Sequence, residues 1–139
     1  MAYDKGNIFA KILKGEIPAI KVYEDASTFA FLDIMPQARG HTLVIPKAPA
    51  ENLFDLPTEF AGPFLLATQK VARAVKAAVK APGLMIAQLN GAAAGQSVFH
   101  VHFHIIPRTE GIDLALHARA KADPLELEAV ATLIRAEIN

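Results

Sequence analysis

Three histidines, His100, His102 and His104, occupy alternate positions in a segment that is otherwise apolar. The residues between them are β-branched or aromatic, which is typical of a strand. Because successive side chains of a strand point to opposite faces, we expect the imidazoles on one face and the apolar side chains on the core face. The expected core-facing residues are Val101, Phe103 and Ile105. A row of three titratable rings fills space poorly but suits a binding or catalytic site.

Four interpretations of this row are open from the residues alone. A solvated strand face normally carries Lys, Glu or Thr, and the segment 98–106 has none of them. One metal ion can bind rings about 6.6 Å apart along a strand, but the outer pair is about 13 Å apart, and the strand supplies no carboxylate. The row could also bind an anion without chemistry. Finally, the middle ring could be a nucleophile towards phosphorus, kept neutral because neighbouring rings discourage one another's protonation. Activity should then fall in acid, between pH 8 and pH 5, as that ring is protonated.

The residues before the row are small and polar, and a fourth histidine lies earlier in the chain. Gly91 and Gly95 permit positive φ angles, and backbone N–H groups of such loops can cradle a phosphate, although an ordinary connection has the same composition. Gln96 and Ser97 bring an amide and a hydroxyl to the start of the expected strand. His41 opens an apolar run, from where it could pair with the row and orient one ring.

Hydrophobic periodicity predicts an α+β domain, in which a five-stranded antiparallel sheet carries one long helix, a short N-terminal helix and a C-terminal helix. Thr58 is the expected cap of the long helix, and Pro82 with Gly83 should end it. Asp123 and Pro124 predict the start of the C-terminal helix. The expected strands cover 20–25, 28–33, 41–46, 84–90 and 98–106, and the other helical segments cover 7–14, 51–56 and a tail from about 120 to 139.

The histidine segment is identified as a complete match to the signature of the histidine triad (HIT) family, which is His-φ-His-φ-His-φ-φ with φ apolar. Here it reads His100-Val101-His102-Phe103-His104-Ile105-Ile106. The resemblance covers nearly the whole chain and is closest to the Hint-like and small bacterial HIT hydrolases. The galactose-1-phosphate uridylyltransferase branch differs, because its triad ends in Gln where this chain has His104.

The resemblance implies a nucleotide hydrolase or nucleotidyl transferase that acts at the α-phosphate of purine nucleoside phosphoramidates or dinucleoside polyphosphates. His102 would attack the phosphorus and become transiently nucleotidylated, and water would then release AMP or GMP. His100 and His104 would bind and position the phosphate, with His104 close to the leaving group. The alternative is a non-catalytic homodimer that binds or senses nucleotides and acts through protein partners.

The resemblance also assigns residues around the substrate. Gln96 and Ser97 would hydrogen-bond phosphate or leaving-group atoms, and Asn90 would contact the phosphate or ribose. Asp33 would accept hydrogen bonds from the ribose hydroxyls. The apolar base pocket would consist of Phe9, Ile12, Phe31, Ile34 and Leu43.

Many bacterial relatives of this branch carry a structural zinc, held by Cys-x-x-Cys, a later His and a triad-region His. The matching positions here are Asn7, Ala10 and Pro49, and the chain has no cysteine. We therefore expect no zinc there and no cofactor, although a substrate-bound magnesium is compatible with attack by histidine. The branch also implies a homodimer.

The composition is that of one compact domain over residues 1–139, with 53% hydrophobic and 20% charged residues. Fourteen basic and fourteen acidic residues cancel, so we expect no binding to nucleic acid. Apolar runs fall short of the roughly 18 residues that cross a membrane. The start of the chain lacks the pattern of a signal peptide, and the absence of cysteine fits the cytoplasm. His117 lies in a polar stretch and is expected on the surface.

Overall fold

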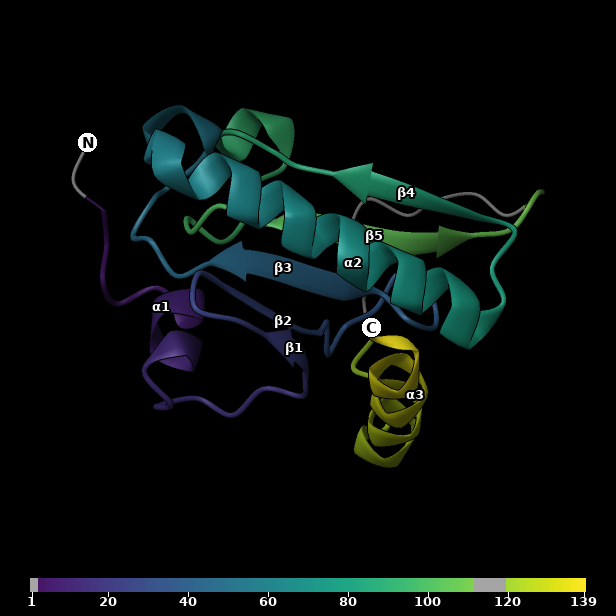
Figure 1. Ribbon diagram of the computed structural model, residues 1–139. Helices are drawn as coiled ribbons and strands as arrows, with labels where there is room; N and C mark the ends of the chain where they lie inside the picture. The colour runs from purple at the N-terminus through teal and green to yellow at the C-terminus, as the bar shows by residue number, and fades with distance from the viewer. Residues whose placement is uncertain (1–2, 112–119) are drawn as a thin grey trace.

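The computed structural model describes residues 3–111 and 120–139 and has the predicted α+β class, with five strands in one antiparallel sheet (Figure 1). The order of the strands is β1-β2-β3-β5-β4. The strands are β1 (Lys21–Glu24), β2 (Thr28–Leu32), β3 (Thr42–Pro46), β4 (Gly83–Ala87) and β5 (Phe103–Arg108). The α-helices are α1 (Ile8–Leu13), α2 (Ala61–Val79) and α3 (Pro124–Glu137). Short 3-10 turns are η1 (Leu53–Asp55), η2 (Thr58–Phe60) and η3 (Ala92–Ala94). The prediction for His117 falls outside the described residues.

The two faces of the sheet carry separate apolar clusters. The main core contains side chains of the sheet, α2 and α3, and α2 runs across this face in Figure 1. Val101 and Ile105 are buried in it and Phe103 packs against it, as the alternation predicted. The second cluster contains Phe9 of α1 and side chains of β2 and β3. Since His104 lies opposite Leu43, a member of the second cluster, the histidines face the α1 side.

The strand that carries the histidines is shorter than predicted. β5 begins at Phe103, so the predicted strand was wrong over residues 98–102, and β5 extends instead to Arg108. The ladder with β3 ends at the pair Val44 and Phe103. Before that point the chain leaves the sheet, because the N–H of Val101 donates to the carbonyl of Ala50, 2.9 Å away, in the segment after β3.

The ends of the long helix also differ from the prediction. Thr58 lies in η2 and does not cap α2, whose N-cap Phe60 makes no side-chain cap bond. The helix ends at Val79, earlier than predicted, because Lys80 adopts a left-handed conformation. β4 is likewise shorter than the predicted 84–90, since it ends at Ala87. The start of α3 was predicted correctly, because the Asp123 side chain accepts from the N–H of Leu125.

The two edge strands of the sheet, β1 and β4, differ in what contacts them. At the β1 edge, Arg135 of α3 donates from Nε to the carbonyl of Lys21 at 2.8 Å. The opposite edge is β4, whose sequence is apolar. In the described part of the chain β4 pairs with β5 on one side and with no strand on the other.

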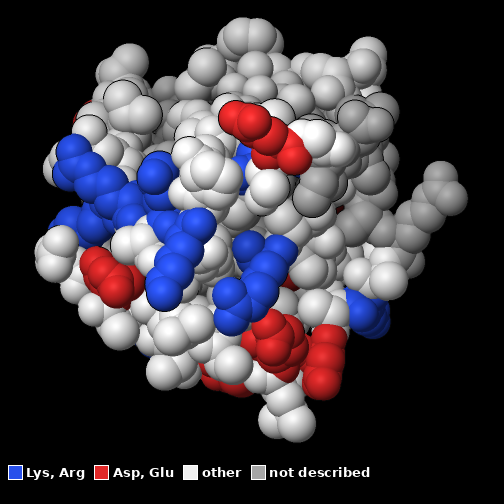
Figure 2. Space-filling view, turned by 90° about the vertical axis from the view of Figure 1, so that its right-hand side faces the viewer, with Lys and Arg blue, Asp and Glu red and all other residues white. Residues whose placement is uncertain are grey.

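Figure 2 shows one face of the molecule on which acidic side chains lie next to the basic ones. None of the helices within 3–111 and 120–139 is long and apolar enough to span a bilayer.

Candidate active site

The position and protonation of the His102 ring are set by the backbone next to it. Its Nδ1 lies 2.7 Å from the carbonyl oxygen of His100, so Nδ1 carries a proton and donates it. The ring is buried, with 6% of the residue exposed, and burial lowers its pKa to about 4. A neutral ring with a proton on Nδ1 has its lone pair on Nε2. Such a ring has the chemistry of a nucleophile at Nε2 near neutral pH.

Both nitrogens of the His100 ring are engaged. Nε2 lies 2.8 Å from the carbonyl oxygen of Pro46, to which it donates. Nδ1 therefore accepts, and the hydroxyl of Tyr3 lies 2.5 Å away as its donor. The residue is fully buried, and burial lowers its pKa although the carbonyl of Pro46 acts in the opposite direction. His100 is a neutral ring held from two sides.

His41 and His104 form a second hydrogen-bonded pair at the site. The backbone N–H of Gln37 donates to Nδ1 of His41 at 2.9 Å, so the proton of this ring is on Nε2. Nε2 in turn lies 3.1 Å from Nδ1 of His104, which accepts. Burial, followed by the charges of His104 and His102, lowers the pKa of His41 to about 3, so it stays neutral. In the neutral form of His104 the proton is consequently on Nε2.

Asp33 joins this pair from the loop after β2. Its Oδ2 lies 3.6 Å from Nε2 of His41, and its Oδ1 accepts from the N–H of Met35 at 2.8 Å. Because His41 is neutral and 3.6 Å exceeds hydrogen-bond length, this contact is not an ion pair. Burial raises the pKa of the Asp33 carboxyl. The tertiary structure thus supplies a carboxylate that the histidine strand itself lacks.

The three side chains Asp33, His41 and His104 have ligand atoms within 4.8 Å of one another, a spacing that could enclose a cation. However, metal binding through Nε2 of His41 requires its lone pair, and that places the proton on Nδ1. Nδ1 already accepts from the N–H of Gln37, so a proton there would face another proton. This backbone bond favours the metal-free form of the cluster.

The loop that precedes the triad is held by its own side chains. Gly91 and Gly95 both have positive φ angles, 93° and 101°, as predicted. Gln96 is buried, accepts from the N–H of Gly91 at 2.8 Å and donates to the carbonyls of Glu51 and Val98. Its amide is therefore used within the loop and is not presented to a phosphate, which differs from the expectation. Ser97 is exposed beside it.

Asn90 is also tied to neighbouring segments. Its Oδ1 accepts from the N–H of Leu53 at 2.9 Å and from Nε2 of Gln88 at 2.8 Å, and its Nδ2 donates back to Gln88. It thus joins the segment after β4 to η1. The structure does not place this side chain in contact with the histidines.

Most of the expected base-pocket residues come together next to the triad. Phe9, Phe31 and Leu43 are buried in the second cluster, and Ile12 packs against it. The Phe9 ring meets His102 edge-on, with 4.9 Å between centroids. Ile34 is not part of this cluster; it is half-exposed and follows Asp33. A buried apolar and aromatic cluster therefore adjoins His102.

Two contributors to this geometry, Tyr3 and the backbone of Gln37, were not predicted from the sequence. Tyr3 lies before the first helix, where no periodicity marks it, and it approaches His100 only through the fold. Gln37 acts through its backbone N–H, which no side-chain pattern encodes. Both set the tautomer of a histidine rather than adding a further reactive group.

The fold and the site define a histidine triad protein, in which β5 and the segment before it place alternate histidines beside an apolar cluster. A family model described as HIT domain matches residues 14–111. The chain belongs to the HIT family. A solved Hit-like protein from Bartonella henselae is 51% identical, with a TM-score of 0.94 and coverage of 99% of this chain and 100% of that one.

Two further relatives bear on the site. A zinc-bound histidine triad family protein from Mycobacterium smegmatis is 40% identical, with a TM-score of 0.83 and coverage of 95% of this chain and 92% of that one. The adenosine 5'-monophosphoramidase HNT1 of Saccharomyces cerevisiae is 43% identical over 107 residues, which is 77% of this chain and 65% of that protein.

The residues at the expected zinc position do not fit the metal. Asn7 accepts from the N–H of Ala10 as the cap of α1, and its Nδ2 donates to the carbonyl of Asp4. Ala10 and Pro49 have no side-chain ligand atom. The ring of His100 offers no vacant lone pair, since Tyr3 occupies Nδ1 and Nε2 is the donor to Pro46.

Proposed function

We propose that the chain is a nucleotide hydrolase that transfers the nucleotidyl group of a purine nucleoside phosphoramidate or dinucleoside polyphosphate, with its α-phosphate, to His102 and then to water. The observation that carries this proposal is the 2.7 Å bond from Nδ1 of His102 to the carbonyl of His100. It leaves a lone pair on Nε2 of a neutral, buried ring. Membership of the HIT family and similarity to a yeast phosphoramidase support the class of reaction.

In the first step Nε2 of His102 forms a bond to the α-phosphorus, and the bond from phosphorus to the leaving group breaks with its electron pair. The positive charge that develops on the ring is stabilised by the donor bond from Nδ1 to His100. Nε2–H of His104 can give a proton to the departing nitrogen or oxygen, and His41 holds that tautomer. The oxygen of water then bonds to the phosphorus and its proton passes to solvent. The bond from phosphorus to Nε2 breaks with its electron pair on nitrogen, which releases AMP or GMP and regenerates neutral His102.

The nucleoside is assigned to the side of the site that α1 covers. Phe9, Ile12, Phe31 and Leu43 form an apolar cluster beside His102, and a purine would pack against it. Asp33, whose Oδ2 lies 3.6 Å from Nε2 of His41, has a carboxylate that can accept from ribose hydroxyls. Ser97 is exposed and can donate to phosphate or leaving-group atoms.

The test is AMP release from adenosine 5'-phosphoramidate and from diadenosine tetraphosphate, measured side by side for the wild type and His102→Ala. AMP affinity is measured by calorimetry on both proteins. We expect turnover of at least one substrate by the wild type, and a loss on the order of 10³-fold or more in the variant with AMP still bound. Binding of AMP without turnover by the wild type would instead support the non-catalytic, nucleotide-sensing alternative.

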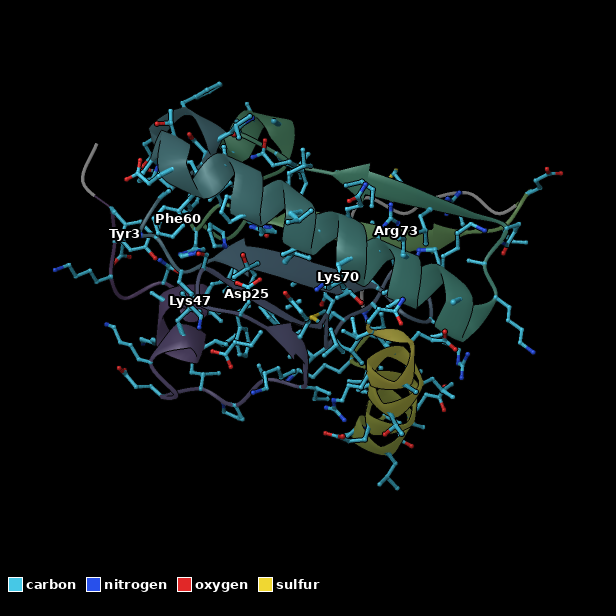
Figure 3. All side chains as sticks on the ribbon, viewed as in Figure 1. Tyr3, Asp25, Lys47, Phe60, Lys70 and Arg73 are labelled. Carbon is cyan, nitrogen blue, oxygen red and sulfur yellow. The ribbon has the colours of Figure 1, made fainter. Side chains whose placement is uncertain are left out.

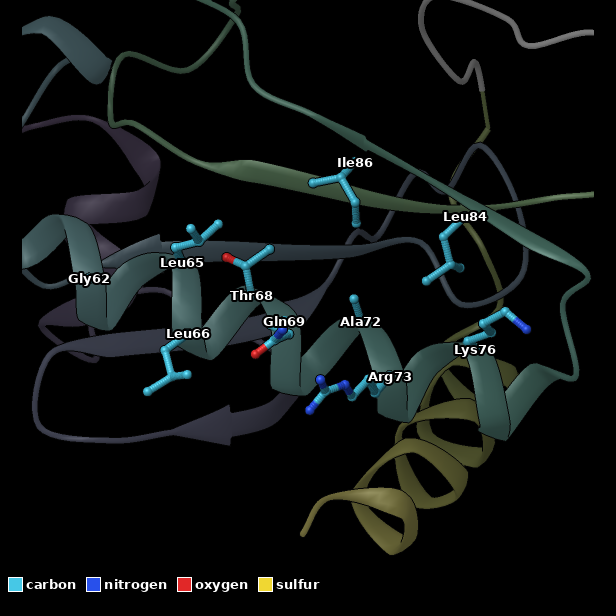
Figure 4. A pocket seen from close by; sticks show the side chains of 10 residues that line it. All are labelled: Gly62, Leu65, Leu66, Thr68, Gln69, Ala72, Arg73, Lys76, Leu84 and Ile86. Carbon is cyan, nitrogen blue, oxygen red and sulfur yellow. The ribbon is translucent and has the colours of Figure 1, made fainter.

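The proposal includes a homodimer formed through α2 and β4. These elements line a groove of about 560 Å³, whose aliphatic side chains are shown in Figure 4. Leu65 and Leu66 are more than 60% exposed, and Ile86 of β4 is 44% exposed. β4 is an edge strand with apolar sequence, and such an edge can pair with a second copy of itself. A second copy would bury this groove and continue the sheet.

We also propose a single domain, no nucleic-acid partner and a cytoplasmic location for this chain. One domain over residues 1–139 is supported by α3, whose apolar side chains share the main core with the sheet. The neutral net charge gives no reason to propose a nucleic-acid partner. The cytoplasm is proposed from the absence of cysteine in the sequence.

A further inference from the structure

His100 and His102 lie in a segment that the sheet does not hold. β5 begins at Phe103, so neither residue has a ladder partner. Their placement depends on individual contacts, among them the bond from Val101 to Ala50 and the bond from Nε2 of His100 to Pro46. Any further contact to this segment therefore bears directly on the orientation of the nucleophile.

Tyr3 makes such a contact. Its hydroxyl lies 2.5 Å from Nδ1 of His100, and the two rings meet at 69° with centroids 5.6 Å apart. Figure 3 shows Tyr3 on the N-terminal segment that leads into α1. This segment continues to Phe9, whose ring packs against His102. The N-terminal segment and α1 therefore contact two histidines of the triad, His100 through Tyr3 and His102 through Phe9.

We propose that Tyr3 is a positioning residue of the triad. Its hydroxyl fixes the ring of His100, beside the position where this chain lacks the side chains that would bind a zinc ion. By donating to Nδ1, Tyr3 makes Nε2 the donor to Pro46 and anchors the ring. The carbonyl of the same residue accepts from Nδ1 of His102 and so fixes the tautomer of the nucleophile. The link to catalysis rests on the proposed function, whereas the effect on His100 does not.

The groups around His100 are consistent with a neutral ring. Burial lowers its pKa, and the negative charge of Asp55 in η1 acts weakly in the opposite direction. His102 faces it, and a charged His100 would disfavour charge there. A hydroxyl that donates to Nδ1 stabilises only the neutral form, so removal of the hydroxyl should raise the pKa of His100.

The experiment compares Tyr3→Phe with Tyr23→Phe. The control removes the other tyrosine hydroxyl of the chain. Tyr23 lies on β1, and its hydroxyl donates to Oδ2 of Asp25 at 2.7 Å. Ring ¹⁵N chemical shifts of the histidines are recorded against pH by NMR, and kcat and KM are measured with adenosine 5'-phosphoramidate. The NMR readout needs no turnover, so it tests the contact even if the proposed function fails.

In Tyr3→Phe we expect the Nδ1 signal of His100 to shift and its titration to move to higher pH. We also expect kcat to fall by about tenfold, the size of a lost buried hydrogen bond, with KM changed by less than about threefold. Tyr23→Phe should match the wild type in both measurements. An unchanged His100 signal, or a changed signal with full kcat, would overturn the proposal.

Discussion

At the scale of single residues, the site consists of histidines whose tautomers are assigned by their partners, and burial lowers the pKa of His41, His100 and His102. Backbone carbonyls accept from Nδ1 of His102 and from Nε2 of His100, whereas a backbone N–H donates to Nδ1 of His41. Each bond decides which nitrogen keeps a lone pair. The three rings of the row therefore have three different hydrogen-bonding environments, although its sequence is a simple repeat.

The first prediction concerns the pH dependence of turnover. From the usual pKa of histidine, near 6.5, activity should fall between pH 8 and pH 5. Burial lowers the pKa of His102 to about 4, so the lone pair on Nε2 persists to lower pH. We now expect kcat to stay within about twofold from pH 8 to pH 5.5 and to fall as pH approaches 4. Rates of AMP release at constant ionic strength measure kcat at each pH, and circular dichroism checks that the protein is folded. An apparent pKa near 6.5 in the kcat profile would contradict the prediction.

The second prediction concerns His41, which contacts His104. In His41→Ala we expect kcat to fall by roughly 10- to 100-fold, because His104 loses the donor that sets its tautomer. The nucleotide affinity should change far less. Steady-state assays and AMP calorimetry separate these effects.

The control for His41 is Arg39→Ala in the same loop. The guanidinium of Arg39 makes an exposed ion pair with Glu126 at 3.0 Å, which contributes little to stability. The kcat of Arg39→Ala should stay within about twofold of the wild-type value. Equal losses in both variants would indicate a loop that is merely distorted.

At the scale of elements, the C-terminal helix is part of the core that supports the site. The N–H of Ala122, just before α3, donates to the carbonyl of Ile34, and Ile34 follows Asp33 in the chain. Leu127, Val130 and Ile134 of α3 are buried against the sheet and α2. The helix thus has a packing role, as its apolar stripe predicted, and it also contacts the loop that carries Asp33.

A pair of adjacent residues on α3 tests this role. Ile134 is fully buried whereas Leu133 is 43% exposed. We expect Ile134→Ala to lower the free energy of unfolding by about 2–5 kcal/mol, and Leu133→Ala to lower it by less than about 1 kcal/mol. Urea denaturation followed by circular dichroism measures both. Similar values for the two variants would mean that α3 does not pack as described.

At the scale of the whole molecule, buried neutral histidines make stability depend on pH. In the unfolded chain histidine binds a proton near pH 6.5, whereas native His102 and His41 do so only near pH 4 and 3. The native state is therefore favoured fully above pH 6.5 and loses stability as pH falls towards 4. We expect a loss of about 2 kcal/mol for each ring between pH 7 and pH 5. Urea midpoints at these pH values measure it, and equal midpoints would contradict it.

The proposed dimer can be tested through its exposed leucines. Leu65→Glu places a charge in the groove between α2 and β4, and we expect it to convert a dimer into a monomer at micromolar concentration. Leu125→Glu is the control, since Leu125 is 79% exposed on α3, away from this groove. Light scattering after size exclusion gives the mass. A wild-type monomer, or a dimer in Leu65→Glu, would contradict the interface.

Local patterns were sufficient for much of this structure. Period-two alternation placed Val101 and Ile105 in the core and the histidines on the other face, because side-chain direction along an extended chain is a local property. Asp123 and Pro124 marked the start of α3 for the same reason, since capping involves only neighbouring residues. The predicted Thr58 cap failed because a 3-10 turn intervenes.

The sequence by itself determined the fold class, the family and the identity of the triad, since these depend on periodicity and on one contiguous motif. Only the tertiary structure decided where β5 begins, which nitrogen of each ring holds a proton, and that Tyr3 and Asp33 meet the site. The predicted pairing of His41 with the row is confirmed by its contact with His104. It also showed that the amide of Gln96 is used within its loop. The physical reason is that hydrogen bonds and burial between segments up to 97 residues apart fix tautomers and pKa values, and no local pattern encodes such contacts.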